Sequence, residues 1–243
     1  MTLAVFSVSL WQIKNHMSNT QLRQVYIDIE EILRMIFESI RTDKTAFIDA
    51  ALSPTGVASL RSRITLKVAA RHGESPVETE SSEGVLRTGE GLKISESART
   101  SLAQITDRLS RLVELSRQKA QKHLLFSDKA FQEIEYLFGS LKYLFRCLGE
   151  VETSRSSGTT LLKYITDTAG ALDEATQRFA AEHEERLIAG LCNPLSTPVY
   201  LDLLQNIRQI LSALKSLTRE IKQPVTDLPV QPTADVPKAS PKV

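Results

Sequence analysis

Histidine and glutamate stand together at His183-Glu184-Glu185, and both residue types can bind a metal ion or move a proton. A zinc-protease signature needs a second histidine four positions after the first, and Leu187 stands there instead. Three glycines, Gly84, Gly89 and Gly91, lie among acidic residues and follow no strand, so they do not form a phosphate-binding loop. No Gly-x-Ser-x-Gly turn is present. The sequence therefore predicts no catalytic residue and no cofactor, and we expect a protein that is not an enzyme.

The two cysteines, and the histidines at positions 123 and 183, favour structural roles. Cys147 and Cys192 are too few for a disulfide framework, and we expect both to be buried as small apolar side chains in a reducing compartment. His123 and His183 are expected at helix ends or on the surface.

The chain has 243 residues and a net charge of +1, a balance that gives no reason to expect nucleic-acid binding. Residues 3–11 form an uncharged, mostly apolar run that is too short to span a bilayer. One interpretation is the trailing end of a membrane region, with Trp11 and Lys14 at the interface. The interpretation that we favour is a helix start packed on the protein, or a loose terminus. We expect a cytoplasmic protein, peripheral at most to the inner face of the membrane.

Apolar residues recur every three or four positions over most of the chain, and no segment alternates as a strand does. This pattern predicts an all-α fold with phenylalanines such as Phe131, Phe138 and Phe145 in its core. The six expected helices cover approximately residues 19–41, 43–71 with a break at Ser53-Pro54, 95–123, 127–148, 158–189 and 196–222.

Three segments lack this periodicity. Residues 73–91 are rich in Gly, Ser and Glu and predict a long loop, and residues 153–158 predict a shorter break. Residues 223–243 hold five of the nine prolines and predict an extended, disordered tail. The expected organisation is an apolar segment at 1–18, a helical domain at 19–222 with halves at 19–124 and 125–222, and the tail.

The connection between the last two helices has strong local signals. Gly190 and Asn193-Pro194 are expected to stop the fifth helix, because Gly tolerates a positive φ and Pro cannot continue a helical ladder. Ser196 or Thr197 is expected to cap the sixth helix, with Pro198 in its first turn.

This region resembles the last two helices of PhoU-like domains, above all those appended to bacterial sodium/phosphate cotransporters. The residues that carry the resemblance are His183-Glu184-Glu185-Arg186-Leu187, Gly190-Leu191-Cys192-Asn193-Pro194 and Tyr200-Leu201-Asp202-Leu203-Leu204. Leu125-Phe126-Ser127-Asp128 resembles the family's junction between its third and fourth helices. The resemblance covers about residues 21–222. It implies two pseudo-repeated three-helix units that form an up-and-down bundle.

The family's metal-binding carboxylates have mostly been replaced. PhoU-like domains carry a Glu and an Asp four positions apart on the third and sixth helices, where both carboxylates face one cation. The corresponding positions here are Ser110 and Glu114 on the third helix and Arg208 and Ser212 on the sixth. A permanent positive charge opposes cation binding, so no metal ligand is predicted.

Two other charged positions favour structural roles. Asp107 and Arg111 are spaced for an i,i+4 ion pair, and Asp202 lies near a helix start, where the helix dipole favours negative charge.

The resemblance implies a regulatory or accessory protein for phosphate uptake that contacts a membrane phosphate transporter or a phosphate-signalling protein, without nucleic acid. Association with the membrane through that partner or the N-terminus, and a homo-oligomer, are compatible with the sequence. Two alternatives stay open. One is a metal-binding PhoU protein with ligands at other positions, and the other is a helical scaffold or adaptor unrelated to phosphate.

Overall fold

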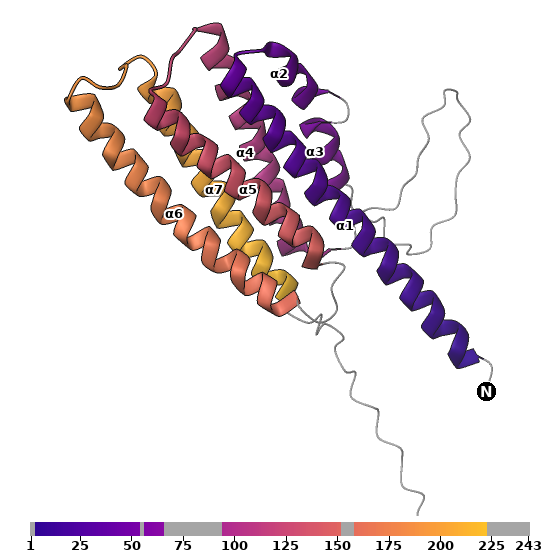
Figure 1. Cartoon of the computed structure of the whole chain (residues 1–243). Coiled ribbons are helices and arrows are strands. Elements are labelled where there is room, and N and C mark those ends of the chain that lie inside the picture. The colour runs from indigo at the N-terminus through magenta and orange to yellow at the C-terminus, as the bar shows by residue number, and fades with distance from the viewer. Residues whose placement is uncertain (1–2, 54–55, 66–93, 152–157, 223–243) are drawn as a thin grey trace, which may run out of the picture.

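The computed structural model consists of α-helices (Figure 1) and describes residues 3–53, 56–65, 94–151 and 158–222, with side chains from Thr20 onward. The described ranges hold seven helices and no strand, which confirms the all-α prediction. The helices are α1 (Leu3–Thr42), α2 (Thr45–Leu52), α3 (Val57–Thr65), α4 (Glu96–Gln121), α5 (Asp128–Val151), α6 (Gly158–Ile188) and α7 (Thr197–Lys222).

The five long helices run up and down beside one another, as Figure 1 shows. Helix α1 packs on α5, α5 on α6, α6 on α7, and α7 on α4, while α4 also contacts α1. The short helices α2 and α3 pack against α1 and α4. The bundle is held by apolar stripes that face one another, as in other up-and-down helical proteins.

The first two predicted helices differ from the observed ones. The first helix begins at Leu3 instead of residue 19, and its N-terminal part extends past the other helices (Figure 1). The expected break at Ser53-Pro54 separates α2 from α3. Helix α3 ends at Thr65, and the predicted continuation to residue 71, the loop at 73–91, most of the break at 153–158 and the tail at 223–243 lie outside the described residues. Within the described ranges, no helix combines the length and apolar character needed to cross a bilayer.

Local signals explain where the later helices begin and end. The Ser95 hydroxyl accepts a hydrogen bond from the backbone of Ala98 over 3.1 Å, and the Ser127 hydroxyl accepts one from Ala130 over 3.3 Å. Both serines therefore cap the start of the helix that follows them. At the end of α6, Gly190 has a φ of +70°. The backbone N–H of Leu191 bonds to the carbonyl of Arg186 over 2.8 Å, which completes the helix-ending motif that glycine favours.

Ser196 behaves differently from the expected cap of α7. Its carbonyl accepts the first helical bond from Tyr200 over 3.0 Å, but its hydroxyl donates to the carbonyl of Asn193 over 2.9 Å. The Thr197 hydroxyl likewise lies 3.4 Å from the Asn193 carbonyl, to which it donates. These side chains close the turn before α7 and leave the first helical N–H groups uncapped by Ser196.

The core is one continuous apolar cluster to which every helix contributes. Phe138 and Phe145 are fully buried, whereas Phe131 is only partly buried against the cluster. Leu204 and Ile207 of α7 are buried, as their stripe predicts. Cys147 and Cys192 are also buried, with free thiols. This packing fixes the ends of the long helices, where the candidate site lies.

Candidate contact site at one end of the bundle

Three connections meet at one end of the bundle: the α1–α2 turn, the α4–α5 loop and the α6–α7 loop (Figure 1). The Lys119 ammonium near the end of α4 donates to the Asp43 carboxylate in the α1–α2 turn over 2.6 Å. The Ser127 hydroxyl and the Cys192 thiol of the other two loops lie 3.8 Å apart, within hydrogen-bond distance for sulfur. We call this end of the molecule the loop end.

A buried ion pair lies just beneath the loop end. Glu133 of α5 is 2 % exposed, and its two carboxylate oxygens accept hydrogen bonds of 3.1 and 2.9 Å from the guanidinium of Arg186 on α6. The Tyr200 hydroxyl of α7 donates to the same carboxylate over 2.5 Å. A buried carboxylate is tolerated because its charge is paired and its oxygens are hydrogen-bonded. Three helices are therefore tied together at one carboxylate.

His183 belongs to the same buried group. Its ring lies 4.4 Å from the Tyr200 ring between centroids, tilted by 30°, and its Nε2 lies 3.0 Å from the Thr197 hydroxyl. Burial lowers the pKa of His183, and the nearby charge of Arg186 lowers it further. His183 lies near the end of α6, one of the two positions expected for it, but it is 2 % exposed, so the other expected position, the surface, was wrong. By contrast, His123 is exposed at the end of α4, with a φ of +49°, as expected.

The environment also keeps Tyr200 and Arg186 protonated. Burial and the hydrogen bond to Glu133 raise the pKa of the Tyr200 hydroxyl. Burial alone would lower the pKa of Arg186, but hydrogen bonds to Glu133 and Cys192 outweigh it and raise that pKa. The group therefore holds one negative and one positive charge around a neutral phenol and a neutral imidazole. Such a network fixes the relative positions of the three helices that contribute to it.

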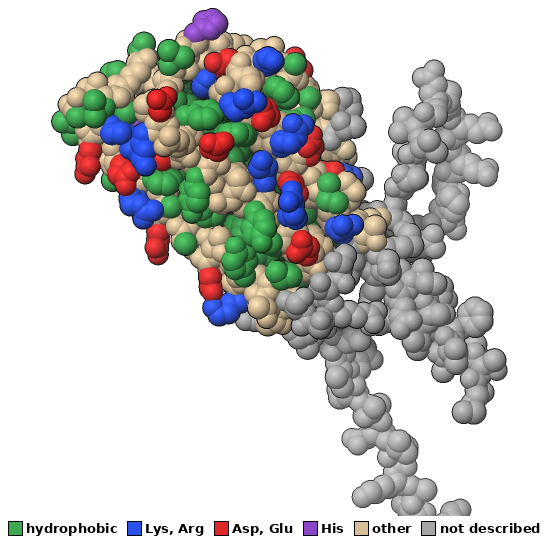
Figure 2. Space-filling model, viewed as in Figure 1, with side chains coloured by type: hydrophobic (Ala, Val, Ile, Leu, Met, Phe, Trp, Pro, Cys, Tyr) green, Lys and Arg blue, Asp and Glu red, His purple; other side chains and the backbone are tan. Residues whose placement is uncertain are grey.

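Four large aliphatic side chains project from the loop end into solvent. Leu125 of the α4–α5 loop is 70 % exposed, and Ile188, Leu191 and Leu195, at the end of α6 and in the α6–α7 loop, are 88, 69 and 75 % exposed. Hydrophobic side chains are also visible over the α6–α7 connection at the upper left of Figure 2. Grouped exposed aliphatics mark interaction sites more often than isolated ones do. We call these four residues the loop-end surface.

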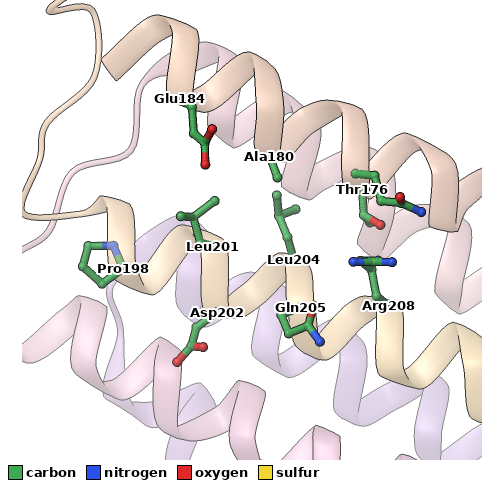
Figure 3. Close-up of a pocket in the computed structure, with 10 residues that line it drawn as sticks. Thr176, Ala180, Glu184, Pro198, Leu201, Asp202, Leu204, Gln205 and Arg208 are labelled. Atoms are coloured by element: carbon green, nitrogen blue, oxygen red, sulfur yellow. The ribbon is translucent and has the colours of Figure 1, made fainter. Parts of the chain in front are cut away.

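A second feature is a shallow groove of about 380 Å³ between α6 and α7 (Figure 3). At one end, the Arg208 guanidinium donates to the Asp173 carboxylate over 2.9 Å, and the Lys215 ammonium lies 3.5 Å from the other oxygen of that carboxylate. Burial tends to raise the pKa of Asp173, but the hydrogen bond from Arg208 and the charge of Lys215 lower it overall. An internal cation therefore occupies the position where the resemblance would place a metal carboxylate.

The other positions of the expected metal motifs are also engaged or apart. Glu114 accepts a hydrogen bond of 3.0 Å from Arg117, Ser110 donates to a backbone carbonyl of its own helix, and Ser212 is exposed on α7. Among the described residues, no group of three or more His, Cys, Asp and Glu side chains is placed to hold a metal ion. That metal is absent from the protein remains a prediction.

Two carboxylates have partners that local spacing did not predict. Asp107 pairs with Arg61 of α3 over 2.5 Å instead of with Arg111. Arg111 bonds to Asp202 over 2.7 Å and so links α4 to α7. The expected i,i+4 pair was therefore wrong, because arginine side chains reach across to neighbouring helices. Asp202 lies in the second turn of α7 and has a structural role as expected, with Arg111 of α4 as its partner.

Sequence reasoning missed Glu133, the centre of the buried group. A signal was present, since Glu133 lies on the same face as Ala130 and Leu137, where the α5 stripe is otherwise apolar. The structure does bring together His183, Arg186, Cys192 and Tyr200. These four residues come from the three segments, 183–187, 190–194 and 200–204, that carry the resemblance to PhoU-like domains.

Comparison with protein-family models, with curated proteins and with solved structures finds no match to this chain. The functional interpretation therefore rests on the geometry of the loop end and on the residues that form it.

Proposed function

We propose that the protein is a non-enzymatic, PhoU-like accessory protein for phosphate uptake that acts by contact with a membrane phosphate transporter or its regulator. The observation that carries the contact role is the loop-end surface. Each of its four aliphatic side chains, Leu125, Ile188, Leu191 and Leu195, is more than two thirds exposed to water. Covering such side chains with a partner is favourable, because it removes apolar surface from water.

The buried group supports the same role, because it holds these loops in a fixed arrangement. Arg186 lies two residues before Ile188, and Tyr200 follows Leu195 after a single helical turn. Both are bonded to Glu133 of a third helix. A rigid surface loses less conformational entropy on binding than a mobile one, which favours recognition of a defined partner.

Helix packing is compatible with the two three-helix units that we propose. In that arrangement α1 corresponds to α5, the α2–α3 pair to α6, and α4 to α7. Helix α1 packs on α5 and α4 on α7, so two of the three elements contact their proposed counterparts. These two contacts support a PhoU-like arrangement of the helices, whereas the link to phosphate rests on the sequence resemblance.

The ion pair of Arg208 with Asp173 favours a contact function over a metal function. A guanidinium held 2.9 Å from the carboxylate cross-links α6 and α7 without a metal ion. We propose a cytoplasmic location at the inner face of the membrane, where a transporter partner would present its cytosolic loops.

The test uses a double variant of the loop-end surface, Leu191→Asp with Leu195→Asp, in cells that otherwise lack the protein. We expect loss of co-purification with the phosphate transporter and a phosphate uptake curve equal to that of the deletion. The matched control is Ile27→Asp on α1, which also replaces an exposed aliphatic side chain with a carboxylate. Ile27 is 42 % exposed. Position 27 lies 15 residues from the loop-end terminus of α1, or about 22 Å along the helix.

Equal uptake in cells with and without the protein, across a range of external phosphate, would refute the phosphate role. If instead the double variant loses a partner that is neither a transporter nor a phosphate regulator, the contact surface stands and the protein is a scaffold for another process.

A further inference from the structure

Helix α5 carries an exposed stripe along its outer face. At helical spacing this stripe includes Lys129, Gln132, Tyr136, Gly139, Tyr143, Arg146 and Glu150, and every one of these residues is exposed. Tyr136 is 54 % exposed and Tyr143 is 51 % exposed. In Figure 2 hydrophobic groups lie over α5 and α6 in the middle of the visible face. The stripe therefore combines aromatic residues with charges at its two ends.

No described residue packs closely against the α-carbon of Gly139 at the centre of the stripe. A Cβ atom added at Gly139 would meet no atom within 4 Å. Glycine in a helix interior is less stable than alanine, so Gly139 costs helix stability, and no crowding against the described part of the chain requires it. A small residue on an exposed helix face does allow a second backbone to approach closely. Gly139 therefore leaves this face of α5 open to close approach by a second helix.

The tyrosines on either side of Gly139 are held in place from behind. Tyr136 packs edge to face on Phe179 of α6, with ring centroids 6.3 Å apart, and Tyr143 packs in the same way on Tyr164, at 6.2 Å. Rings that are fixed on one side and half exposed on the other lose little freedom when a partner covers them. Aromatic residues of this kind are enriched in protein interfaces.

The order of residues on the stripe is complementary to itself. Tyr136 and Tyr143 lie at equal distances on either side of the midpoint between Gly139 and Ser140, and so do Lys129 and Glu150. When a second α5 is placed antiparallel across Gly139, Tyr136 of each copy meets Tyr143 of the other. Lys129 of each copy then meets Glu150 of the other, which pairs opposite charges.

We propose that α5 forms the interface of a two-fold symmetric homodimer, with Gly139 at the point where the two helices cross. This inference does not depend on the phosphate assignment. The interface leaves the loop-end surface uncovered at the end of each bundle, so the dimer presents two such surfaces to its partners.

The oligomeric state of the full chain tests the proposal by sedimentation velocity between 1 and 100 μM. We expect concentration-dependent dimerisation of the wild-type protein and at least tenfold weaker association of Gly139→Leu. The same substitution should raise the melting temperature of the dilute protein, since leucine favours helix and meets open space at this position. Weaker association together with a more stable monomer separates an interface from a folding defect.

Gly170 provides a matched control, because a Cβ atom added there also meets nothing within 4 Å. Gly170 shares a side of α6 with Thr166 and Asp173, whose side chains bond to α7 instead of facing α5. Gly170→Leu should stabilise the helix similarly and leave dimerisation unchanged. Equal weakening by both leucine variants would overturn the assignment to α5.

Charge reversal tests the antiparallel register. Lys129→Glu alone and Glu150→Lys alone should each weaken the dimer several-fold, and the two changes together should restore it. A wild-type chain that stays monomeric up to 100 μM, or a double variant no better than the single ones, would refute the proposed interface.

Discussion

Tyr200 on α7 donates its hydroxyl hydrogen to Glu133 on α5 across 2.5 Å, and so joins two helices that otherwise contact each other little. The same carboxylate is bonded twice to Arg186 of α6. A single buried residue thereby connects three helices beneath the loop-end surface. If one bond is lost, a buried charge or hydroxyl is left without its partner, and this cost is larger than the net value of the bond.

Replacing Glu133 should destabilise the protein more than replacing any exposed carboxylate of α5. Glu133→Gln leaves the largely buried guanidinium of Arg186 with only the more distant carboxylate of Glu182, 3.7 Å away, as a counter-charge, and we expect a loss of about 3 kcal/mol in the free energy of unfolding. Tyr200→Phe removes only one hydrogen bond and should cost about 1 kcal/mol. Urea titration measures both, with Glu135→Gln, an exposed change on the same helix, as the neutral control. A cost for Glu133→Gln no greater than that of the control would show that the ion pair contributes nothing to stability.

His183 should make the stability of the protein sensitive to mild acid. Its pKa is lowered in the folded state by burial and by Arg186, whereas an unfolded histidine has a pKa of about 6.5. The unfolded chain therefore binds a proton first as the pH falls, so the stabilisation from neutral His183 is full above about pH 6.5 and declines below it. Urea midpoints measured from pH 7.5 to pH 5.5 should fall less steeply for His183→Gln than for the wild type. Parallel slopes for the two proteins would contradict the lowered pKa.

The apolar stripe of α7 should be essential for stability. Leu204 is 2 % exposed and Ile207 is 0 % exposed, so each change to alanine leaves a cavity and should cost about 2–5 kcal/mol. Gln205 lies between them and is exposed, which makes Gln205→Ala the matched control. Chemical denaturation of the three variants gives the comparison. If Leu204→Ala or Ile207→Ala were as harmless as the control, the buried face of α7 would have been misassigned.

Features that depend on a few neighbouring residues could be predicted from the sequence. The stripe of α7 and the helix end at Gly190 follow from periodicity and from tolerance of a positive φ. Such signals act within one or two helical turns. They also gave the all-α class, because each helix must bury its own stripe.

Pairing between helices could not be predicted in the same way. Asp107 and Arg111 have the spacing of a local ion pair, yet each bonds to a residue of a different helix. Exposed local pairs are worth only a few tenths of a kcal/mol, so a long arginine side chain readily takes another partner of equal strength. Glu133 shows the same limit, since its polar position on an apolar face indicates burial but does not reveal which groups bond to it.

The groove between α6 and α7 should bind no metal ion in the wild-type protein. Because Arg208 is paired with Asp173, we expect no stoichiometric iron, manganese or zinc in protein purified without added chelator, as measured by metal analysis. The double change Arg208→Glu with Ser212→Asp removes one positive charge and places two carboxylates on one face of α7, close to Asp173.

In calorimetric titration, Mn²⁺ should bind the double variant at least tenfold more tightly than the wild type. The variant should first lose stability, because carboxylates then face one another across α6 and α7, and Mn²⁺ should restore that stability through linkage. Lys215→Met supplies a control, since it removes a positive charge from the same carboxylate without adding a ligand, and it should raise Mn²⁺ affinity much less. Tight binding of Mn²⁺ by the unmodified protein would instead show that the ligands lie elsewhere in the chain, and would favour a metal-dependent function over one based on contacts alone.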